Sequence, residues 1–292
     1  MEDITLKEKA RHGNSMFPLN IYSIPDINGT YSLSHHWHNE IEIVYVEEGE
    51  LIFQIDTQIM RLSQGEYVFI NSGQLHSAYA SDNKASIHHA IVFDANMLSS
   101  SIYDYCQNKY IDPILNKSIR LPLYIDCQCS CGKKVRNEIL EIIDAYTCKL
   151  NGWELAIKAS LLKLISILAV EDKLLKKDIY HSVSKDYKVE LIKKVLNFIH
   201  NNYRQKIYIH ELAQEINLNT QYFCKLFKSV IGKTPVEYIN RYRVEQAAKI
   251  LQTGNGKIIE ICYSVGFDNF SYFIKKFKEY KNCTPSQYKR NI

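Results

Sequence analysis

The spacing of hydrophobic residues changes character along this chain. From about Ile21 to Phe93, short runs of β-branched and aromatic residues alternate with turn residues. Closely spaced runs of this kind predict an antiparallel β-sandwich or barrel. Glu48-Gly49-Glu50 separates two of the runs and predicts a turn there. Past Gly132 the apolar residues recur at helical spacing instead.

Two amphipathic helices are predicted after Gly132, with a break at Asn151-Gly152. Their apolar positions are Val135, Ile139, Ile142, Ile143 and Tyr146, then Leu155, Ala156, Ala159, Leu162, Leu164, Ile165 and Leu168. This helical pair is expected to form a homodimer interface, because two-fold pairing is the commonest oligomeric arrangement. The alternative is that the pair packs against its own barrel.

The last third of the chain contains one helical pattern twice. Thr220 to Lys228, followed by Gly232, Thr234-Pro235 and Tyr238, is matched fifty residues later by Ser271 to Lys278, Asn282, Thr284-Pro285 and Tyr288. A period of this length indicates repeated supersecondary units. Each copy predicts a short helix, a turn and a second helix, which is the helix-turn-helix arrangement whose second helix enters the DNA major groove.

The outward faces of the two second helices are the candidate DNA-binding surfaces. In the first copy they carry Thr220, Gln221, Cys224, Lys225 and Lys228; in the second they carry Asn269, Phe270, Ser271, Ile274, Lys275 and Lys278. Short polar and basic side chains suit base edges flanked by phosphates. Phe270 and Ile274 either touch a thymine methyl group or pack against the protein. Asp268 or Asn269 is expected to cap the second reading helix.

The ends of the repeated helices carry matching signals. Gly232 and Asn282 follow the two reading helices, where a left-handed residue is expected. Each Thr-Pro then opens a new helix. The helix from about 235 to 251, which carries Arg241 and Arg243, would connect the two readers and hold them in successive major-groove turns about 34 Å apart.

Charge is distributed unevenly over the 292 residues, which are enough for two domains. From Lys188 onward there are 18 Lys and Arg against 8 Asp and Glu, a balance of +10, whereas the preceding part has a balance of −6. This asymmetry indicates a polyanionic partner. The alternatives are a solvated basic surface on a helical bundle without a DNA role, and a protein that coats DNA without sequence preference.

The first residues, Met1 to Lys7, mix charges where a signal peptide would have an apolar core, and no apolar run approaches the ~20 residues that span a bilayer. We therefore expect a cytoplasmic protein without a membrane partner. In that compartment the eight cysteines are expected to be free thiols. Cys127, Cys129 and Cys131 alternate in a way that is not typical of zinc sites, so they indicate either a loop or a redox or metal sensor.

Residues 189 to 290 resemble the AraC/XylS family of bacterial transcription regulators. The most specific part runs from Val265-Gly266-Phe267 through Ser271-Tyr272-Phe273 to Phe277-Lys278, Thr284-Pro285-Ser286 and Tyr288. The resemblance implies a double-stranded DNA-binding domain with two reading helices, which usually activates transcription by contacting RNA polymerase. Lys275 replaces a frequent arginine and Asn282 a usual glycine. Lysine lacks the bidentate fork of arginine, so the second reader is expected to read bases less strongly.

The front domain resembles the cupins. His36-Trp37-His38, Glu42 and Gly49 match the first cupin motif, and Gly65, Gly73 and His76 match the second, with Asn71 and Ala80 as departures. In metal-binding cupins the positions of His36, His38, Glu42 and His76 are the ligands of a divalent transition metal. In related sensor domains the same positions, together with Trp37, line an effector pocket or form bare scaffold. His36 and His38 alternate along a strand and so point to one side.

The expected fold is α+β with several domains. A cupin-like, jelly-roll-like antiparallel β-barrel at 1–131 senses an effector, and a helical pair at 132–171 is followed by a linker at 172–187. The DNA-binding domain at 188–292 contains helix-turn-helix units at about 209–229 and 258–281. The expected function is a non-enzymatic, sequence-specific activator controlled by a sugar-like effector. The alternative is a metal-dependent cupin enzyme or metal sensor fused to a DNA-binding module. The four potential ligands motivate it, but the sequence contains no separate catalytic constellation.

Overall fold

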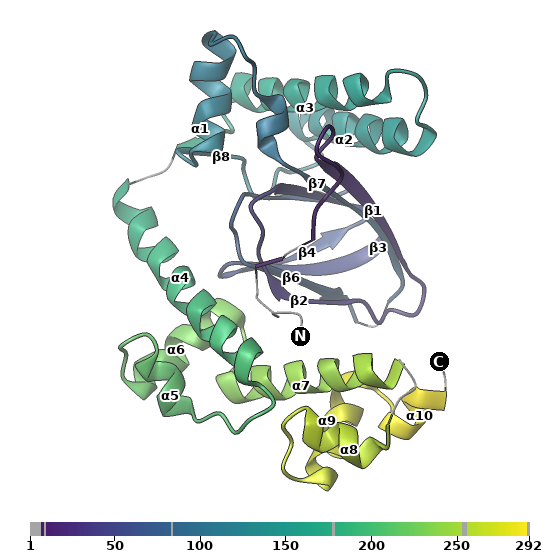
Figure 1. Cartoon of the computed structure of the whole chain (residues 1–292). Helices are drawn as coiled ribbons and strands as arrows, with labels where there is room; N and C mark the ends of the chain where they lie inside the picture. The colour runs from purple at the N-terminus through teal and green to yellow at the C-terminus, as the bar shows by residue number, and fades with distance from the viewer. Residues whose placement is uncertain (1–6, 9, 83, 177–178, 253–255, 291–292) are drawn as a thin grey trace. The chain divides into compact units, whose positions relative to one another are not determined.

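The computed structural model describes residues 7–8, 10–82, 84–176, 179–252 and 256–290, and for 179–186 it describes only the helical backbone. The charged N-terminal segment at 1–6 lies outside the described residues. The chain divides into two compact units, Lys7–Val183 and the part from Ser184 onward. Each unit is described by itself below (Figure 1).

The first unit is built on a curled antiparallel sheet (Figure 1). Its strands are β1 (Leu19–Asp26), β2 (Ser32–His36), β3 (Ile41–Ile55), β4 (Gln58–Ser63), β5 (Tyr67–Ile70), β6 (His76–Ala80) and β7 (Ser86–Phe93). They are ordered β1-β7-β3-β6-β2, with β4 and β5 also paired to β3. This arrangement confirms the predicted antiparallel, cupin-like barrel.

The turn predicted at Glu48-Gly49-Glu50 is wrong, because β3 runs through it. The register of β3 against β7 shifts between Val46 and Glu48, which marks a bulge, and Gly49 has a φ of +77°. A bulge with a left-handed glycine bends a strand without ending it. The part before the bulge pairs with β5 and β7, and Glu48 and Gly49 just after it still pair with β7. From Glu50 onward β3 pairs with β4 and β6, so one strand serves both sides of the barrel.

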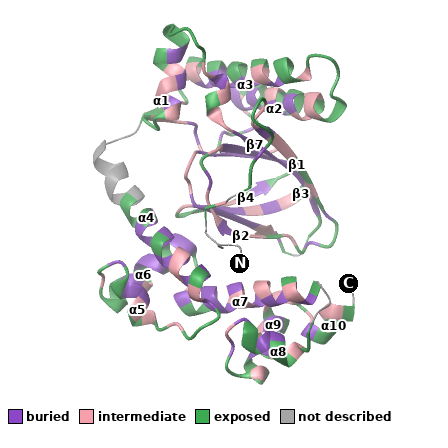
Figure 2. Ribbon diagram, viewed as in Figure 1, coloured by how far each residue is buried: buried purple, intermediate pink, exposed green. Residues whose placement is uncertain are grey.

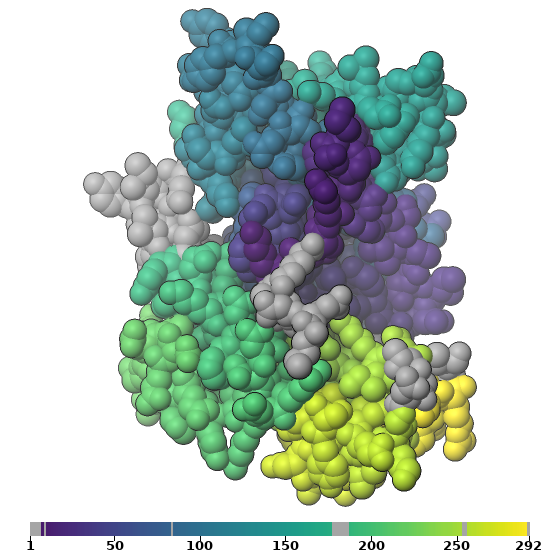
Figure 3. Space-filling model, in the orientation of Figure 1, coloured from purple at the N-terminus to yellow at the C-terminus, as the bar shows by residue number. Residues whose placement is uncertain are grey.

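Helices cover one end of this barrel, and their buried faces share a core with it (Figure 2). They are η1 (Ala95–Leu98), the π-helix η2 (Gln107–Ile111), α1 (Asp112–Leu115), α2 (Ser130–Cys148) and α3 (Trp153–Val170). The segment from 95 to 115 was not expected to be helical. A two-stranded sheet of β8 (Ile119–Arg120) and β9 (Leu175–Lys176) completes the unit. Figure 3 shows the teal helices α2 and α3 beside the blue segment that contains η2 and α1.

The helical pair is present, but its second apolar stripe was placed partly on the wrong face. Val135, Ile139 and Ile142 of α2 are buried as predicted. In α3, however, Leu155 is 74% exposed and Leu162 is also exposed, whereas Ile157, Leu161, Leu164, Ile165 and Leu168 form the buried side. The helix is apolar almost all round, so periodicity alone could not select the buried face.

The second unit is all helical. Its helices are α4 (Ile179–Asn202), α5 (Ile209–Gln214), α6 (Thr220–Ile231), α7 (Pro235–Gln252), α8 (Ile258–Ser264), α9 (Phe270–Lys281) and α10 (Pro285–Arg290). Within the stretch expected to be a linker, 172–187, the chain forms β9 and the first turns of α4. No helix among the described residues combines the length and apolar character needed to cross a bilayer.

Candidate DNA-binding face and histidine cluster

Identical caps fix both reading helices, α6 and α9. Asn219 Oδ1 accepts a hydrogen bond from the backbone N–H of Tyr222, and Asn269 Oδ1 accepts one from that of Tyr272, each at 2.8 Å. These bonds satisfy N–H groups that no helical carbonyl can reach. Of the two residues expected to cap α9, Asn269 is therefore the one that does so.

The C-terminal ends of the reading helices also match. Gly232 has a φ of +76° and Asn282 a φ of +58°, as predicted for left-handed caps. Thr234 and Thr284 then open α7 and α10 by reciprocal hydrogen bonds with Glu237 and Gln287. The two copies thus have the same ends even though Asn282 replaces glycine.

The predicted DNA-binding residues divide into exposed and half-buried side chains. Thr220, Gln221, Lys225 and Lys228 of the first reader and Asn269, Ser271, Lys275 and Lys278 of the second are exposed; Cys224, Phe270 and Ile274 are half-buried. Phe270 and Ile274 pack against the core of the second copy. Of the two roles left open for these residues, the structure supports packing. Tyr222 is 45% exposed on the first reader and was missed.

Helix α7 connects the readers and contacts helices of both copies. At 18 residues and 1.5 Å rise per residue it is about 27 Å long. Neither of its highlighted arginines is positioned as a free cation. Arg241 pairs with Glu245 at 3.2 Å, and Arg243 donates to the carbonyl oxygens of Tyr203 and Gln205 at 2.8 and 2.7 Å. The arginines therefore stabilise the helical frame.

In the first unit, His36, His38, Glu42 and His76 converge. One ligand atom from each lies within 4.8 Å of the others. The Nε2 atoms of His38 and His76 each lie 3.1 Å from Glu42 Oε2. His38, Glu42 and His76 are buried. The residues come from β2, β3, β6 and the loop after β2, so strand pairing rather than sequence proximity brings them together.

Each of the three imidazoles is oriented by a backbone carbonyl. The Nδ1 atoms of His36, His38 and His76 lie 3.0, 3.2 and 2.9 Å from the carbonyl oxygens of Ser34, Glu40 and Gln74. A carbonyl only accepts, so each Nδ1 must carry the proton. In a neutral ring Nε2 then holds a lone pair, and the same orientation is typical of metal-ligating histidines.

The cluster consequently needs a cation. With neutral rings, the lone pairs on the inward Nε2 atoms and the Glu42 carboxylate would face each other with no proton between them. Either protons on the imidazoles or a metal ion resolves this repulsion. At metal–ligand bonds of about 2.0–2.2 Å, two ligands of one ion lie at most about 4.4 Å apart. The donor set therefore fits a divalent transition metal after small side-chain shifts.

The pKa values follow the same geometry. Burial opposes charge on Glu42, but hydrogen bonds with His38 and His76 outweigh it and hold its pKa well below the usual range. Burial also opposes charge on His38, yet the carboxylates of Glu42, Glu8 and Glu40 raise its pKa. Burial, reinforced by His76, lowers the pKa of His36 to about 3. The His36 ring is therefore neutral at physiological pH, which leaves the lone pair of its Nε2 available.

Comparison with known proteins places both units. The helix-turn-helix domain model matches residues 212–291, and the cupin domain model matches residues 27–91. The HTH-type transcriptional regulator YdeC of Bacillus subtilis is 30% identical over 293 residues, covering 99% of this chain and 97% of its own. The chain belongs to the AraC-type family of helix-turn-helix transcriptional regulators. The family resemblance of residues 189–290 is thereby confirmed.

Two more distant proteins align with this AraC-type regulator over most of its length. The Msm operon regulatory protein of Streptococcus mutans is 25% identical, covering 94% of this chain and 98% of its own. The solved structure of ToxT from Vibrio cholerae covers 96% of this chain and 97% of its own, at 17% identity and a TM-score of 0.43.

The N-terminal segment of the AraC-type regulator supplies two residues that sequence reasoning missed. Glu8 Oε2 lies 3.5 Å from His36 Nε2 and 3.8 Å from His12 Nε2, and the His12 ring is 5.6 Å from that of His38. Trp37, expected to line the pocket, forms an isolated bridge with Lys7, whose Nζ lies 5.2 Å from the indole centroid. The segment at 7–12 has no periodic pattern, so only tertiary pairing identifies it.

The eight cysteines are free thiols, as predicted for this regulator. Cys127 and Cys131 belong to the core beneath α2, and Cys129 Sγ accepts a hydrogen bond from the N–H of Gly132 as a helix cap. Burial raises the pKa of Cys127 and of Cys131, which keeps both thiols protonated. This geometry favours the structural interpretation of the three cysteines over a sensor.

Proposed function

We propose that this protein is a sequence-specific transcription activator whose DNA binding is set by a ligand in its first unit. The observation that carries the DNA half is the doubled helix-turn-helix, because α6 and α9 share their caps and expose polar and basic side chains. The +10 balance from Lys188 onward supports DNA as the partner. Activation through RNA polymerase, in the bacterial cytoplasm, is proposed from family membership.

Selection of operators from a random duplex pool tests sequence specificity in the full chain. At one fixed salt concentration, the selected site should bind at least about 10³-fold more tightly than random DNA. Equal affinity would instead support a DNA-coating protein. Because α7 holds α6 and α9 on one face of the DNA, the spacing of the two DNA segments that they contact should matter. Inserting about half a helical turn of DNA between these segments should abolish tight binding. Moving only one of the two segments within the altered site should not restore tight binding.

We propose a divalent transition metal as the ligand of the first unit, held by His36, His38, Glu42 and His76. The inward Nε2 atoms, the carboxylate and the burial of the site support this over the sugar-like effector, whose hydroxyls would have to enter a cluster with spacings near 3 Å. A bound ion would neutralise Glu42 and tie β2, β3 and β6 together. The ion would thus favour one arrangement of the barrel over another.

Elemental analysis and calorimetric titration with Zn²⁺ test this assignment. Stoichiometric binding should be lost in His76→Gln and retained in His210→Gln, since His210 is exposed in the other unit. Thermal-shift screening of sugars in metal-free protein tests the competing effector. If a sugar binds to the metal-free protein, the metal proposal is wrong and the sugar-like effector takes its place. If the metal-loaded protein converts a substrate catalytically, the cupin-enzyme alternative is favoured.

We also propose that the helical pair forms a homodimer interface. Leu140 of α2, Leu150 in the connecting turn and Leu155 of α3 are 40%, 73% and 74% exposed, which supports a second copy as their partner. Leu155→Glu should convert the dimer to a monomer in sedimentation measurements. Ile59→Glu is the matched control, because Ile59 is an exposed apolar residue on β4. A monomeric wild-type protein would contradict the proposal.

A further inference from the structure

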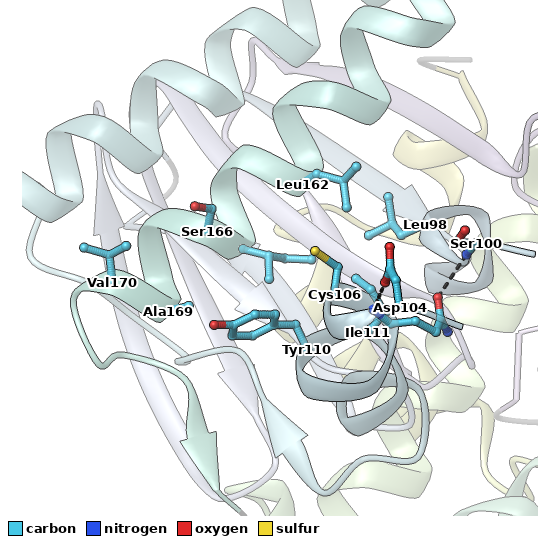
Figure 4. A pocket seen from close by; sticks show the side chains of 12 residues that line it. Leu98, Ser100, Asp104, Cys106, Tyr110, Ile111, Leu162, Ser166, Ala169 and Val170 are labelled. Carbon is cyan, nitrogen blue, oxygen red and sulfur yellow. Dashed lines mark hydrogen bonds between the residues drawn. The ribbon is translucent and has the colours of Figure 1, made fainter. Parts of the chain in front are cut away.

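A second cavity lies in the first unit, away from the histidine cluster. Its volume is about 520 Å³, and it opens between α3 on one side and the segment of η1, η2 and the loop joining them on the other (Figure 4). Leu98, Ile111 and Ile165 are buried lining residues that belong to the core shared with the barrel. Cavities of roughly 300–1,000 Å³ with apolar walls are typical small-molecule sites.

The chemistry of the lining selects the kind of ligand. Asp104 is the only charged residue among the residues described as lining the cavity, and none of these is Lys, Arg or His. Asp104 Oδ1 accepts a hydrogen bond from the N–H of Gln107 at 2.8 Å, which holds the carboxylate at the rim. A carboxylate on an apolar surface repels anions and attracts donors or cations. Ser166 and Tyr110 add hydroxyl groups.

The wall opposite α3 has an unusual backbone. Gln107–Ile111 is a π-helix, and Gln107 is held by its own side chain, whose Oε1 accepts from the N–H of Ser100 while Nε2 donates to Asp112. π-Helical turns are rare and are frequently found at functional sites. The two walls are therefore a regular helix and an irregular segment secured by polar contacts.

Both walls lead to the start of the linker. The π-helix continues into α1 and then β8, while α3 is followed by β9, and Ile119 and Arg120 of β8 pair with Lys176 and Leu175 of β9. The chain passes from β9 towards α4 of the DNA-binding unit. A molecule that changes the spacing of the walls would act directly on the pairing of β8 with β9.

We propose that this cavity binds a small, neutral or cationic apolar molecule, and that the bound molecule modulates DNA binding through β8 and β9. The second clause rests on the proposed regulatory function, whereas the first stands on the cavity alone. The site is distinct from the histidine cluster in both its residues and its ligand chemistry.

A pair of matched fluorescent probes tests the binding site in the full chain. N-Phenyl-1-naphthylamine is neutral and apolar, and its sulfonated analogue, 8-anilinonaphthalene-1-sulfonate, adds a negative charge to the same framework. The neutral probe should bind saturably at one site and more tightly than the anionic probe. Asp104→Asn should reduce the difference in affinity between the neutral and the anionic probe. The asparagine side chain can still accept a hydrogen bond from the N–H of Gln107 but carries no charge.

Filling the cavity provides the second measurement. Ser166→Trp places a large side chain in the opening and should weaken binding of the neutral probe about tenfold or more. Ala159→Trp is the matched control, because Ala159 is exposed on the same helix and does not line the cavity. The probe should also slow maleimide labelling of the exposed rim residue Cys106 but not of exposed Cys148 on α2.

The outcomes separate this site from the proposed function. If Ser166→Trp and Ala159→Trp bind the neutral probe equally, the cavity site is overturned, even if operator binding is intact. If Ser166→Trp changes the oligomeric state in sedimentation measurements but not the binding of the neutral probe, a second copy of the chain covers the opening. The proposal of a small-molecule site then also fails. If the probe binds but leaves selected-operator affinity unchanged, the coupling through β8 and β9 is overturned. A probe-dependent affinity change that Ser166→Trp removes supports both clauses.

Discussion

Asn240 Nδ2 in the connector helix α7 donates a hydrogen bond to the hydroxyl of Tyr272 in the reading helix α9, at 3.0 Å. Asn240 is buried, so this bond compensates an amide that has little access to water. The bond also ties α9 to the connector helix against which it packs. We therefore expect Tyr272 to contribute to the orientation of the second reader.

Tyr272→Phe should lower the free energy of unfolding by about 1 kcal/mol, because it removes a partner of a buried donor. Urea unfolding followed by far-ultraviolet circular dichroism measures the loss. Tyr222→Phe at the matching place on the exposed face of α6 is the control and should change the unfolding free energy by less than about 0.5 kcal/mol. Equal effects of the two substitutions on the free energy of unfolding would show that the hydrogen bond to Asn240 does not stabilise the fold.

Lys225→Ala should weaken operator binding and reduce its dependence on salt. Lys225 is exposed on the first reader, and loss of one phosphate contact lowers the slope of log affinity against log salt by about 1. If Lys225 reads a base instead, the preference for operator over random DNA should fall as well. Lys133→Ala is the charge-matched control, because Lys133 is an exposed lysine on α2 in the other unit. If the folded Lys225→Ala protein binds the operator with unchanged affinity, the prediction that this face of α6 contacts DNA is wrong.

His200 should make the DNA-binding unit sensitive to acid. Its ring stacks on Tyr242 with centroids 3.9 Å apart, and its Nε2 lies 2.9 Å from the Tyr238 hydroxyl. Burial, reinforced by Lys249, lowers the pKa of His200 from 6.5 to about 3. The unfolded chain therefore binds a proton before the folded chain does, and stability present above about pH 6.5 is lost as the pH falls towards 3.

His200→Phe isolates that contribution, since other acid-labile groups such as Glu237 are common to both proteins. The wild-type protein should be the more stable at pH about 7.5, and its advantage in urea unfolding should shrink steadily below pH about 6.5. A pH-independent difference between the two proteins would mean that His200 does not titrate on unfolding in this range.

Gly49→Ala should destabilise the first unit more than Gly152→Ala. Both glycines have positive φ, which costs an alanine roughly 1–2 kcal/mol. A Cβ on Gly49 would also lie 2.2 Å from the Ala85 carbonyl oxygen, whereas a Cβ on Gly152 would have no heavy atom within 4 Å. Both tryptophans, Trp37 and Trp153, belong to this unit, so their fluorescence reports its unfolding. Equal losses would mean that the backbone at Gly49 relaxes away from Ala85.

Sequence reasoning identified the elements whose signals are local. Caps such as Asn269, Gly232 and Asn282 act on the nearest turn of helix, so residue type and position predict them directly. The cupin resemblance named His36, His38, Glu42 and His76, and the structure brings all four together, although His38 lies in the loop after β2 and not on the strand from which alternation was argued. Helical spacing also accounts for the buried side of α6, which consists of Phe223, Leu226 and Phe227.

The features that the sequence did not predict depend on contacts between distant segments. Glu8 and His12 lie beside the histidine cluster in a segment whose Lys7 forms a bridge with Trp37, a pairing of distant segments. β3 continues through Gly49 because Glu48 and Gly49 still pair with Ile87 and Ser86 of β7, which no local pattern encodes. For Phe270 and Ile274 the sequence left contact with DNA and packing against the protein open, and only their contacts with the core of the second copy decide for packing.

The helix ends described above also bear on how such a protein can change its target. Asn219, Gly232, Asn269 and Asn282 hold the reading helices without using Gln221, Lys225, Ser271 or Lys275. Substitution of an outward side chain on one helix should therefore leave the fold and the other helix intact. A lineage can then acquire a new operator in steps. One reading helix continues to bind its part of the original operator while the outward side chains of the other helix change.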